Sequence, residues 1–243
     1  MSEYVSINLN TKFANNVGVS AYLTEPSWYL PEAIHDITSV KLKSFTIPLS
    51  VYTIDSRNNK LQFIEAGSTS SNRVITLPSS NYSGITLASQ LTSALNSVGS
   101  YTYAVNYTTS GTNVLSFSAT GGSFAFTSIA NDAYYECGLD TQLDTLSTTK
   151  TSDTIDLSGI NTVHLVSNVG ACDVINQDFR ILATIPIEES PLSVSYFQDD
   201  SNDYINCNIP SLAEVRFRLY DARFRRITPT KDFNATVNFI CDK

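Results

Sequence analysis

The sequence has few of the residues that favour long helices and few that carry positive charge. It contains one Met, and Ser, Thr and Asn are much commoner than Ala, so helices are not expected to dominate the fold. Lys and Arg number 15 against 23 Asp and Glu, which gives a net charge of -8. This balance argues against a protein whose main task is to bind nucleic acid, because that task requires a cationic surface. It does not exclude a local basic face.

Two further absences concern membranes and targeting. No apolar run approaches the length of about 20 residues that a membrane-spanning helix needs. The residues from Met1 to Tyr4 are polar and acidic, and they lack the apolar core of a signal peptide. We therefore expect a chain that neither spans a membrane nor is secreted.

Catalytic and metal-binding motifs are missing as well. The sequence has two His residues, His35 and His164, and no G-x-S-x-G elbow that could present a nucleophilic Ser. It has no zinc-ligand spacing and no phosphate-binding loop. We therefore expect no enzymatic activity, no cofactor and no metal, and we expect both His residues to be structural or surface residues.

The four Cys residues are far apart and form no C-x-x-C pair. An even count permits disulfides, but without a secretory signal we favour buried free thiols in an intracellular chain. The residues concerned are Cys137, Cys172, Cys207 and Cys241.

What the sequence does contain is typical of β structure. It has 13 Tyr and 12 Phe and many β-branched residues, which favour strands. Its 243 residues permit one large β domain or one domain that carries a sizeable insertion.

A strand from Ser39 to Pro48 organises the first part of the chain. Val40 and Leu42 share one face, and after Ser44 the apolar phase slips by one residue, which indicates a bulge or a strand buried on both faces. Pro48 lacks a backbone donor and ends the strand. Short strands are expected before it, at residues 5–9 and 18–23.

Between residues 56 and 155 the pattern indicates a compact α+β unit. Leu87, Leu91 and Leu95 recur at helical spacing, and Ser83 can cap the start of that helix. Tyr101, Tyr103 and Tyr107 share one face of a predicted strand. The other expected elements are strands at 60–65, 73–78, 115–119 and 124–126, and a short helix at 131–139 that ends at Gly138.

After a Ser- and Thr-rich surface linker at residues 145–154, the β pattern returns. Separate strands are expected at 163–165, 179–187, 192–196, 204–209, 214–219 and 233–241. The fold class is therefore mainly β: a single jelly-roll antiparallel sandwich with an inserted small α+β domain. The expected domains are residues 1–55 with 156–243 for the jelly roll, and 56–155 for the insertion.

Several short motifs follow one another in a characteristic order. They are Phe45-Thr-Ile-Pro48, Val51-Tyr-Thr-Ile54, Asn58-Asn-Lys-Leu-Gln-Phe63, Ile75-Thr-Leu-Pro78, Asn81-Tyr-Ser83, the Leu-spaced helix, and Tyr135 to Leu139 with its Cys-Gly-Leu. This order resembles the penton and minor capsid proteins of tailless icosahedral double-stranded DNA viruses, such as virophages, Polinton-like viruses and giant viruses. The resemblance covers residues 36–140. Ser80 stands where that family usually has Gly before the Asn-Tyr.

The resemblance implies a jelly-roll capsid protein, five copies of which close each icosahedral vertex. It implies contacts with itself in a homopentamer and with neighbouring major and minor capsid proteins, and a place in the virion after assembly inside the host cell. The inserted domain would then project from the capsid surface, where a host receptor or glycan could bind.

Two charged stretches are candidate subunit-interface regions. One is acidic and has no Lys or Arg from residue 188 to 203, and the other places five Arg within eleven residues. The residues are Glu188, Glu189, Asp199 and Asp200 in the first, and Arg216, Arg218, Arg223, Arg225 and Arg226 in the second. A ring of identical subunits needs complementary charges on two different patches, so we expect the Arg residues to pair with the acidic region of a neighbour.

Other interpretations of these regions remain open. The Arg residues could instead face phosphates in the capsid interior, or simply be solvated. The acidic loop at residues 199–203 could bind calcium at a subunit seam, although it lacks the Gly and the terminal Glu of an EF-hand loop. A solvated acidic loop is the favoured alternative.

Two competing functions follow from the fold class. A carbohydrate-binding jelly roll on the virion could use the face of Tyr101, Tyr103 and Tyr107, although a packed core explains these residues more simply. A hydrolase on a β-sandwich would need paired carboxylates in a cleft, which the sequence does not place.

Overall fold

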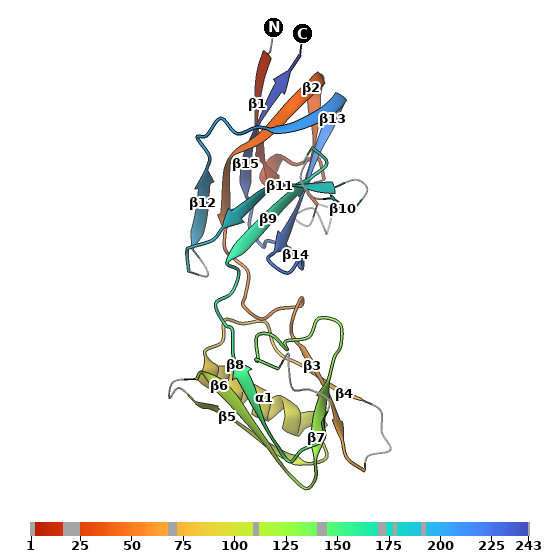
Figure 1. Cartoon of the computed structure of the whole chain (residues 1–243), viewed down its shortest axis with the longest axis vertical. Helices are drawn as coiled ribbons and strands as arrows, with labels where there is room; N and C mark the ends of the chain where they lie inside the picture. The colour runs from red at the N-terminus through yellow and green to blue at the C-terminus, as the bar shows by residue number, and fades with distance from the viewer. Residues whose placement is uncertain are drawn as a thin grey trace. The chain divides into compact units, whose positions relative to one another are not determined.

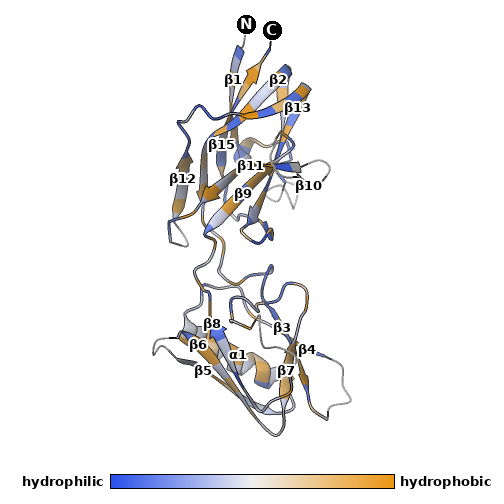
Figure 2. Cartoon of the chain, in the orientation of Figure 1, coloured by the Kyte–Doolittle hydropathy of each residue, from blue (hydrophilic) through white to orange (hydrophobic). Residues whose placement is uncertain are grey.

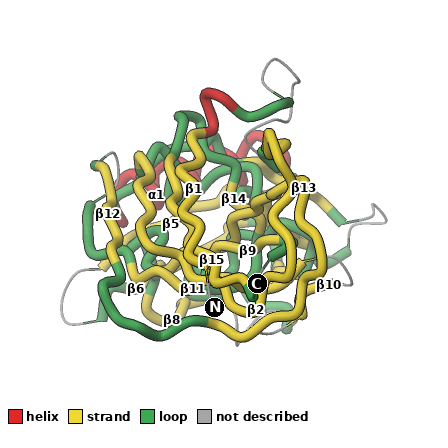
Figure 3. The backbone as a smooth tube through the Cα atoms, turned by 90° about the horizontal axis from the view of Figure 1, so that it is seen from above, coloured by secondary structure: helices red, strands yellow, loops and turns green. Residues whose placement is uncertain are grey.

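The computed structural model describes residues 3–16, 25–67, 72–108, 112–139, 145–169, 174–176, 179–190 and 193–242. The chain splits into two compact units: unit 1, Met1–Val51 with Ile160–Lys243, and unit 2, Tyr52–Gly159. Strands dominate both units (Figures 1 and 3), and the predicted mainly β fold with antiparallel sheets is confirmed. None of the helices in the described ranges is long and apolar enough to cross a bilayer. The strand expected at 18–23 lies outside the described residues.

Unit 1 consists of strands joined into one antiparallel path, in the order β1-β15-β2-β13-β9-β11-β10. β12 pairs with β2, and β14 pairs with β13, beside this path. The strands are β1 (Glu3–Asn10), β2 (Ser27–Pro48), β9 (Thr162–Ser167), β10 (Val174–Asn176), β11 (Phe179–Pro186), β12 (Val194–Gln198), β13 (Ile205–Asp221), β14 (Arg226–Ile227) and β15 (Asn234–Cys241), with the short 3-10 helix η1 (Thr11–Phe13) after β1.

The pairing in unit 1 is nested, as in a jelly roll. Strands from the two ends of the chain pair with each other, since β15 lies between β1 and β2. Moving inward along the sequence, β9 pairs with β13 and β10 pairs with β11. This winding brings early and late segments together in one antiparallel sandwich.

β2 is longer than the sequence pattern predicted, because it begins at Ser27 rather than Ser39 and runs through Pro31. The predicted phase slip is confirmed: Thr236 lies opposite Ser44 and Val237 lies opposite Leu42, so one extra residue bulges between them. The bulge rotates the second half of the strand and keeps its apolar side chains in the core.

β2 also folds back on itself near Asp36, whose φ is +53°. Its second half pairs with β15, where Cys241 lies opposite Ile37, and β15 in turn pairs with β1. At the start of β2 the indole Nε1 of Trp28 donates to the carbonyl oxygen of Asn10, at the end of β1, over 3.0 Å. A straight strand would hold these two residues roughly 50 Å apart at the usual rise per residue, so the first half of β2 must return along the open side of β1.

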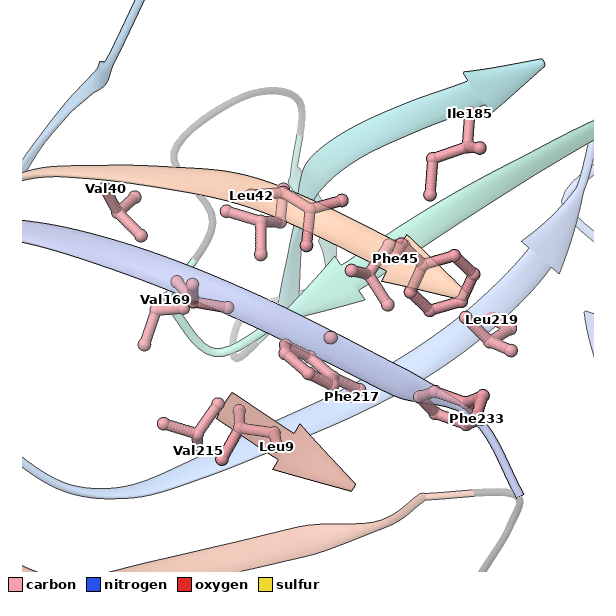
Figure 4. Packing of buried hydrophobic residues seen from close by; sticks show 14 of the residues in the cluster. Leu9, Val40, Leu42, Phe45, Val169, Ile185, Val215, Phe217, Leu219 and Phe233 are labelled. Atoms are coloured by element: carbon pink, nitrogen blue, oxygen red, sulfur yellow. The ribbon is translucent and has the colours of Figure 1, made fainter. Parts of the chain in front are cut away.

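A large hydrophobic core in unit 1 takes side chains from β1, β2, β9, β11, β13 and β15. Apolar and polar residues alternate along its strands (Figure 2), and Figure 4 shows the buried residues converging from several of them. Phe45 packs against Phe233 with ring centroids 5.5 Å apart, and Trp28 packs edge-on against Phe217 at 5.4 Å. Because each buried aromatic ring removes a large area from water, these contacts dominate the cohesion of the sandwich.

β13 replaces two predicted strands with one. The sequence pattern indicated separate strands at 204–209 and 214–219, but residues 205–221 form a single strand. Its first part pairs with β2 and its last part with β9, with register shifts after Asn206 and after Leu212. These irregularities let one strand serve both parts of the sandwich, which no local pattern reveals.

Unit 2 combines two three-stranded antiparallel sheets, β4-β3-β7 and β5-β6-β8, with the helix α1. The helix contacts β5 and β4, and a second hydrophobic core contains its buried face. The elements are β3 (Lys60–Glu65), β4 (Arg73–Thr76), α1 (Gly84–Val98), β5 (Thr102–Thr108), β6 (Val114–Thr120), β7 (Phe124–Thr127) and β8 (Thr149–Thr154).

The predicted helix is confirmed together with its cap. Ser83 is the N-cap, and its side chain and that of Thr86 each accept from the other residue's backbone N–H. Leu87, Leu91 and Leu95 are fully buried, as their spacing indicated.

Two local predictions in unit 2 are wrong. Residues 149–154 form β8 and pair with β6, although their Ser and Thr content indicated a surface linker. Ser152 is buried there, and its hydroxyl accepts from the backbone N–H of Leu115 over 2.9 Å. Residues 131–139 form a turn instead of a short helix. Asn131 has a positive φ, which a helix does not allow, and within this segment just one described backbone bond, from the Cys137 N–H to the Ala133 oxygen, has the i to i−4 spacing of a helix.

Candidate subunit-contact site

The Arg-rich segment projects from one face of β13, as predicted. Arg216 and Arg218 are partly exposed and alternate with the buried Val215, Phe217 and Leu219. β14 returns along the end of β13 and adds Arg226 beside them. The strand period of two therefore sorts the apolar residues into the core and the cations outward.

Glu25, which the sequence did not mark as a site residue, organises these cations. Arg218 donates from Nε and Nη2 to its Oε2 over 2.9 and 2.8 Å. Nη2 of Arg226 lies 3.4 Å from the same oxygen, and Nη1 of Arg216 lies 3.9 Å from Oε1. Glu214 is a second carboxylate 3.9 Å from Arg216. Three guanidinium groups thus lie around two carboxylates, and these contacts orient their side chains.

The turn between β13 and β14 carries an exposed aromatic ring. The Asp221 carboxylate accepts from the backbone N–H groups of Arg223 and Arg225, each over 2.9 Å, and from Nε of Arg225 over 2.8 Å. Phe224 has a φ of +56°, is half exposed, and stacks on His164 with ring centroids 4.8 Å apart. A bulky residue held in this strained region is often functional. The turn presents Arg223 and Phe224 in a fixed arrangement.

The acidic stretch lies on and around β12. Glu188 and Glu189 are exposed in the loop after β11, while Asp199 and Asp200 directly follow β12. Figures 1 and 3 both place β12 and β14 at separate positions in unit 1. Within one chain, the acidic stretch and the Arg-rich face are therefore distinct surfaces.

Two Lys residues of β2 accompany the aspartates that follow β12. Nζ of Lys41 lies 3.0 Å from Oδ1 of Asp199, and Lys43 forms an ion pair with Asp200. Hydrogen bonds with Lys43 and then Gln198 lower the pKa of Asp200, and the same contact with Asp200 raises the pKa of Lys43. Burial would raise the pKa of Asp199, but hydrogen bonds from Ser201 and Lys41 lower it overall.

The ammonium groups of Lys41 and Lys43 thus lie directly beside Asp199 and Asp200. A cation site requires several carboxylate oxygens without competing positive charge. Across the part of the chain that the structure describes, no group of three or more His, Cys, Asp and Glu side chains is placed to hold a metal ion.

The Tyr face that a glycan-binding module would use makes hydrogen bonds within unit 2. Tyr103 is buried and donates to Oε1 of Glu65 over 2.9 Å. The Tyr101 hydroxyl donates to the Ala66 carbonyl, and Tyr107 donates to the Asn113 side chain over 2.9 Å. Their hydroxyl groups are all engaged within the unit, and Tyr103 belongs to its hydrophobic core, while Tyr101 and Tyr107 are partly buried.

The remaining residues that the sequence singled out are the two His and the four Cys residues. His35 is exposed on β2, and Nδ1 of His164 lies 3.0 Å from the Thr184 hydroxyl. Cys137, Cys207 and Cys241 are free thiols, and burial raises the pKa of each. The fourth, Cys172, lies outside the described residues.

Sequence reasoning found the two charged stretches but not their partners. Glu25 lies more than 190 positions from Arg218 along the chain. Lys41 lies 160 positions from Ser201, and Lys43 lies 157 positions from Asp200. The alternation of Lys41 and Lys43 on one strand face was visible, but its pairing with residues 199–200 depends on the fold.

No family model matches the sequence, and no curated protein matches it. Among solved structures, the chain is similar to the penton protein of mavirus: 98% of this chain aligns with 99% of that one at 12% identity and a TM-score of 0.46. A likeness this weak does not assign a function.

A second likeness is to the flagellar cap protein FliD of Escherichia coli. Its D2–D3 domains align with 98% of this chain over 100% of their length at 13% identity, with a TM-score of 0.20. The D1–D2–D3 form aligns over 57% of its length at 11% identity, also with a TM-score of 0.20. These values are lower still than that for the mavirus protein.

Proposed function

We propose that this chain is a structural protein of a viral capsid, and specifically the penton that closes a vertex as a homopentamer. The observation that carries the proposal is the presence of two charged surfaces of opposite sign on different elements of unit 1. The support from sequence is the ordered series of short motifs that resembles the penton and minor capsid family.

A pentameric ring uses the same heterologous contact five times, so each copy must carry both halves of that contact. The turn at Arg223 and Phe224 supplies a cation and an aromatic ring, the residue types that contribute most at interfaces. The exposed carboxylates Glu188 and Glu189 supply the complementary charge. In the proposed ring, the turn of one copy contacts the acidic stretch of the next.

The proposed protein has no catalytic role. It works by geometry: unit 1 contacts its own copies and the neighbouring major capsid proteins, and unit 2 is the inserted domain that faces outward. It resides in the virion after assembly inside the host cell. The carbohydrate-binding alternative is not favoured, because the Tyr residues that it requires are engaged within unit 2.

The test is to measure the mass of the purified full chain by mass photometry, alone and with its capsid partners. A species of five times the 26.6 kDa of the chain is expected. Replacing Arg223→Glu should weaken the pentamer by about tenfold or more, and so should Glu188→Lys with Glu189→Lys. Combining all three replacements should restore it, because the charges are then exchanged across each contact.

Lys231→Glu is the matched control, since Lys231 is exposed and the charge change is the same as at Arg223. It should leave the pentamer intact. A chain that stays monomeric at all concentrations, with and without capsid partners, contradicts the proposal, and a stable monomer that binds a glycan supports the alternative.

A further inference from the structure

A groove of about 740 Å³ opens at one end of unit 1, where β1, the end of β15 and the bend of β2 meet. Figure 1 marks this end by the two chain termini. Its apolar lining comes from partly buried side chains of β1 and of the first half of β2. These are Val5, Ile7, Leu30 and Ile34, and the partly buried Ala33 and the exposed Pro31 complete the lining.

The groove lies between two strand edges that have no partner in the described part of the chain. There β1 pairs with β15 alone, and residues 29–35 of β2 pair with β13 alone. The bond from the Asp242 N–H to the Asp36 oxygen, 3.0 Å long, is where pairing on the β15 side of β2 ends. At the opposite end, the contact of Trp28 with Asn10 closes the space.

The edge of β1 can accept another strand. Natural proteins protect such edges with Pro, Lys, bulges or very short strands, but β1 is an unbulged strand of eight residues without Pro or Lys. Val5 and Ile7 alternate with the exposed Tyr4 and Ser6. An added strand would therefore pair with the backbone of β1 and direct alternate side chains toward the apolar lining.

The rim of the groove is acidic. Glu3, Glu32, Asp36 and Asp242 are all exposed around it, and its described lining includes no Lys or Arg. The thiol of Cys241 lies close to three of these carboxylates. Burial raises its pKa, and the charges of Glu3, Asp36 and Asp242 raise it further. Four carboxylates around an apolar floor select a ligand that is both cationic and apolar.

We propose that this groove binds an extended basic segment of a partner protein, which adds to the free edge of β1 as a strand. Alternate apolar side chains of the segment lie against Val5, Ile7 and Ile34, and the intervening Lys or Arg side chains face the carboxylates of the rim. This site is distinct from the Arg-rich turn and the acidic stretch at β12, and it does not depend on the pentameric arrangement.

The test uses the full chain and fluorescein-labelled nonapeptides, with binding measured by fluorescence anisotropy. A peptide of alternating Lys and Val should bind, and one of alternating Glu and Val should not. Alternating Lys and Ser carries the same charge without the apolar face, and it should bind at least about tenfold more weakly. Equal binding of the two Lys peptides means that only net charge attracts them, and that overturns the proposal.

The location of the binding site is tested with Glu32→Lys, which should weaken binding of the Lys-Val peptide by about tenfold or more. Asp203→Lys, at an exposed carboxylate outside the groove, is the matched control and should change the affinity by less than about twofold. Equal losses in both variants overturn the assignment of the groove.

Hydrogen exchange gives an independent measurement. The bound peptide should slow exchange of backbone amides of residues 4–8, because an added strand pairs with them. Protection elsewhere, with none on β1, overturns strand addition. So does self-association of the chain that Val5→Lys abolishes, since the groove would then hold a second copy and not a basic segment.

Discussion

Glu25 shows how a single carboxylate orders a distant part of this chain. It precedes β2 in sequence and holds Arg218 and Arg226 near the end of the chain. The three side chains are partly exposed, so solvent screens their attraction and the contact contributes orientation more than stability. At this scale, the candidate interface is arranged by ion pairs within the subunit before any neighbour arrives.

In unit 2, Glu65 at the end of β3 is likewise a carboxylate that holds distant groups in place. Its side chain is buried, and it accepts from the Ser100 N–H over 2.7 Å and from the Tyr103 hydroxyl over 2.9 Å. Nε of Arg73 lies 3.0 Å from its second oxygen. Burial alone would raise the pKa of Glu65, but the hydrogen bonds and then the Arg73 charge lower it overall.

The first prediction concerns Glu65 and pH. Because its folded pKa lies below the unfolded value of about 4.3, its contribution to stability is fully present above that pH and is lost as pH falls through the folded pKa. Glu65→Gln should lower the free energy of unfolding of unit 2 by about 3 kcal/mol at neutral pH. It should also reduce the loss of stability on acidification, as followed by the near-ultraviolet circular dichroism of Tyr in denaturant.

Trp28 is the single Trp of the chain and belongs to unit 1. The unfolding transition seen by Trp fluorescence should therefore be the same in Glu65→Gln and in the native sequence. An identical pH dependence of the Tyr signal in both proteins would show that Glu65 carries no linked proton.

At the scale of the elements, the turn at residues 133–139 requires a specific backbone conformation and specific hydrogen bonds. Gly138 has a φ of +61°, and the bonds from Leu139 N–H to the Tyr134 oxygen and from Gly138 N–H to the Tyr135 oxygen form a Schellman motif. The Gly138 oxygen accepts from the Asp153 N–H over 2.8 Å, which attaches the turn to β8. The prediction that Gly138 ends this segment was therefore correct, but the segment that it ends is a turn and not a helix.

The second prediction compares two Gly residues with positive φ. A Cβ at Gly138 would lie 2.3 Å from the Asp153 oxygen, whereas a Cβ at Gly67 would have no atom within 4 Å. Gly67→Ala should cost about 1 kcal/mol, from the backbone conformation alone. Gly138→Ala should cost more than about 3 kcal/mol, because the backbone of β8 must move as well.

Both costs are measured as shifts in the denaturant midpoint of unit 2, and the pair separates conformational strain from steric conflict. Equal costs in the two variants would mean that the contact with β8 relaxes freely, against the expected rigidity of this corner.

At the scale of the whole molecule, the described residues of each unit form a large hydrophobic core of their own. One contains Phe45, Phe217 and Phe239, and the other contains Phe63, Leu91 and Phe126. Each compact unit therefore buries its own apolar surface, the requirement for independent folding. The division at residues 1–55, 56–155 and 156–243 stays our proposal for the domains.

The third prediction tests that proposal directly. Residues 52–159, produced alone, should fold into a unit that contains the capped helix α1 and unfolds in one cooperative transition. Hydrogen exchange should show strong protection of the amides of Leu91 and Leu95, which are buried in its core. Loss of cooperative unfolding would show that unit 2 needs unit 1 in order to fold.

The sequence by itself determined the features that depend on near neighbours. The apolar alternation of residues 233–241, the Leu spacing and Ser83 cap of α1, and the phase slip after Ser44 all act within a few residues, so the mainly β fold was predictable. Cohesion of the Phe-rich cores follows from the same composition.

Only the tertiary structure decided which distant residues meet. It joined 204–209 and 214–219 into one strand, turned the polar segment at 149–154 into β8, and folded β2 back at Asp36. It also brought Glu25 to Arg218, and it placed β1 and the first half of β2 on the two sides of the acidic groove. Strand partners and ion pairs separated by most of the chain depend on how the whole path closes around its cores, and no local pattern contains that information.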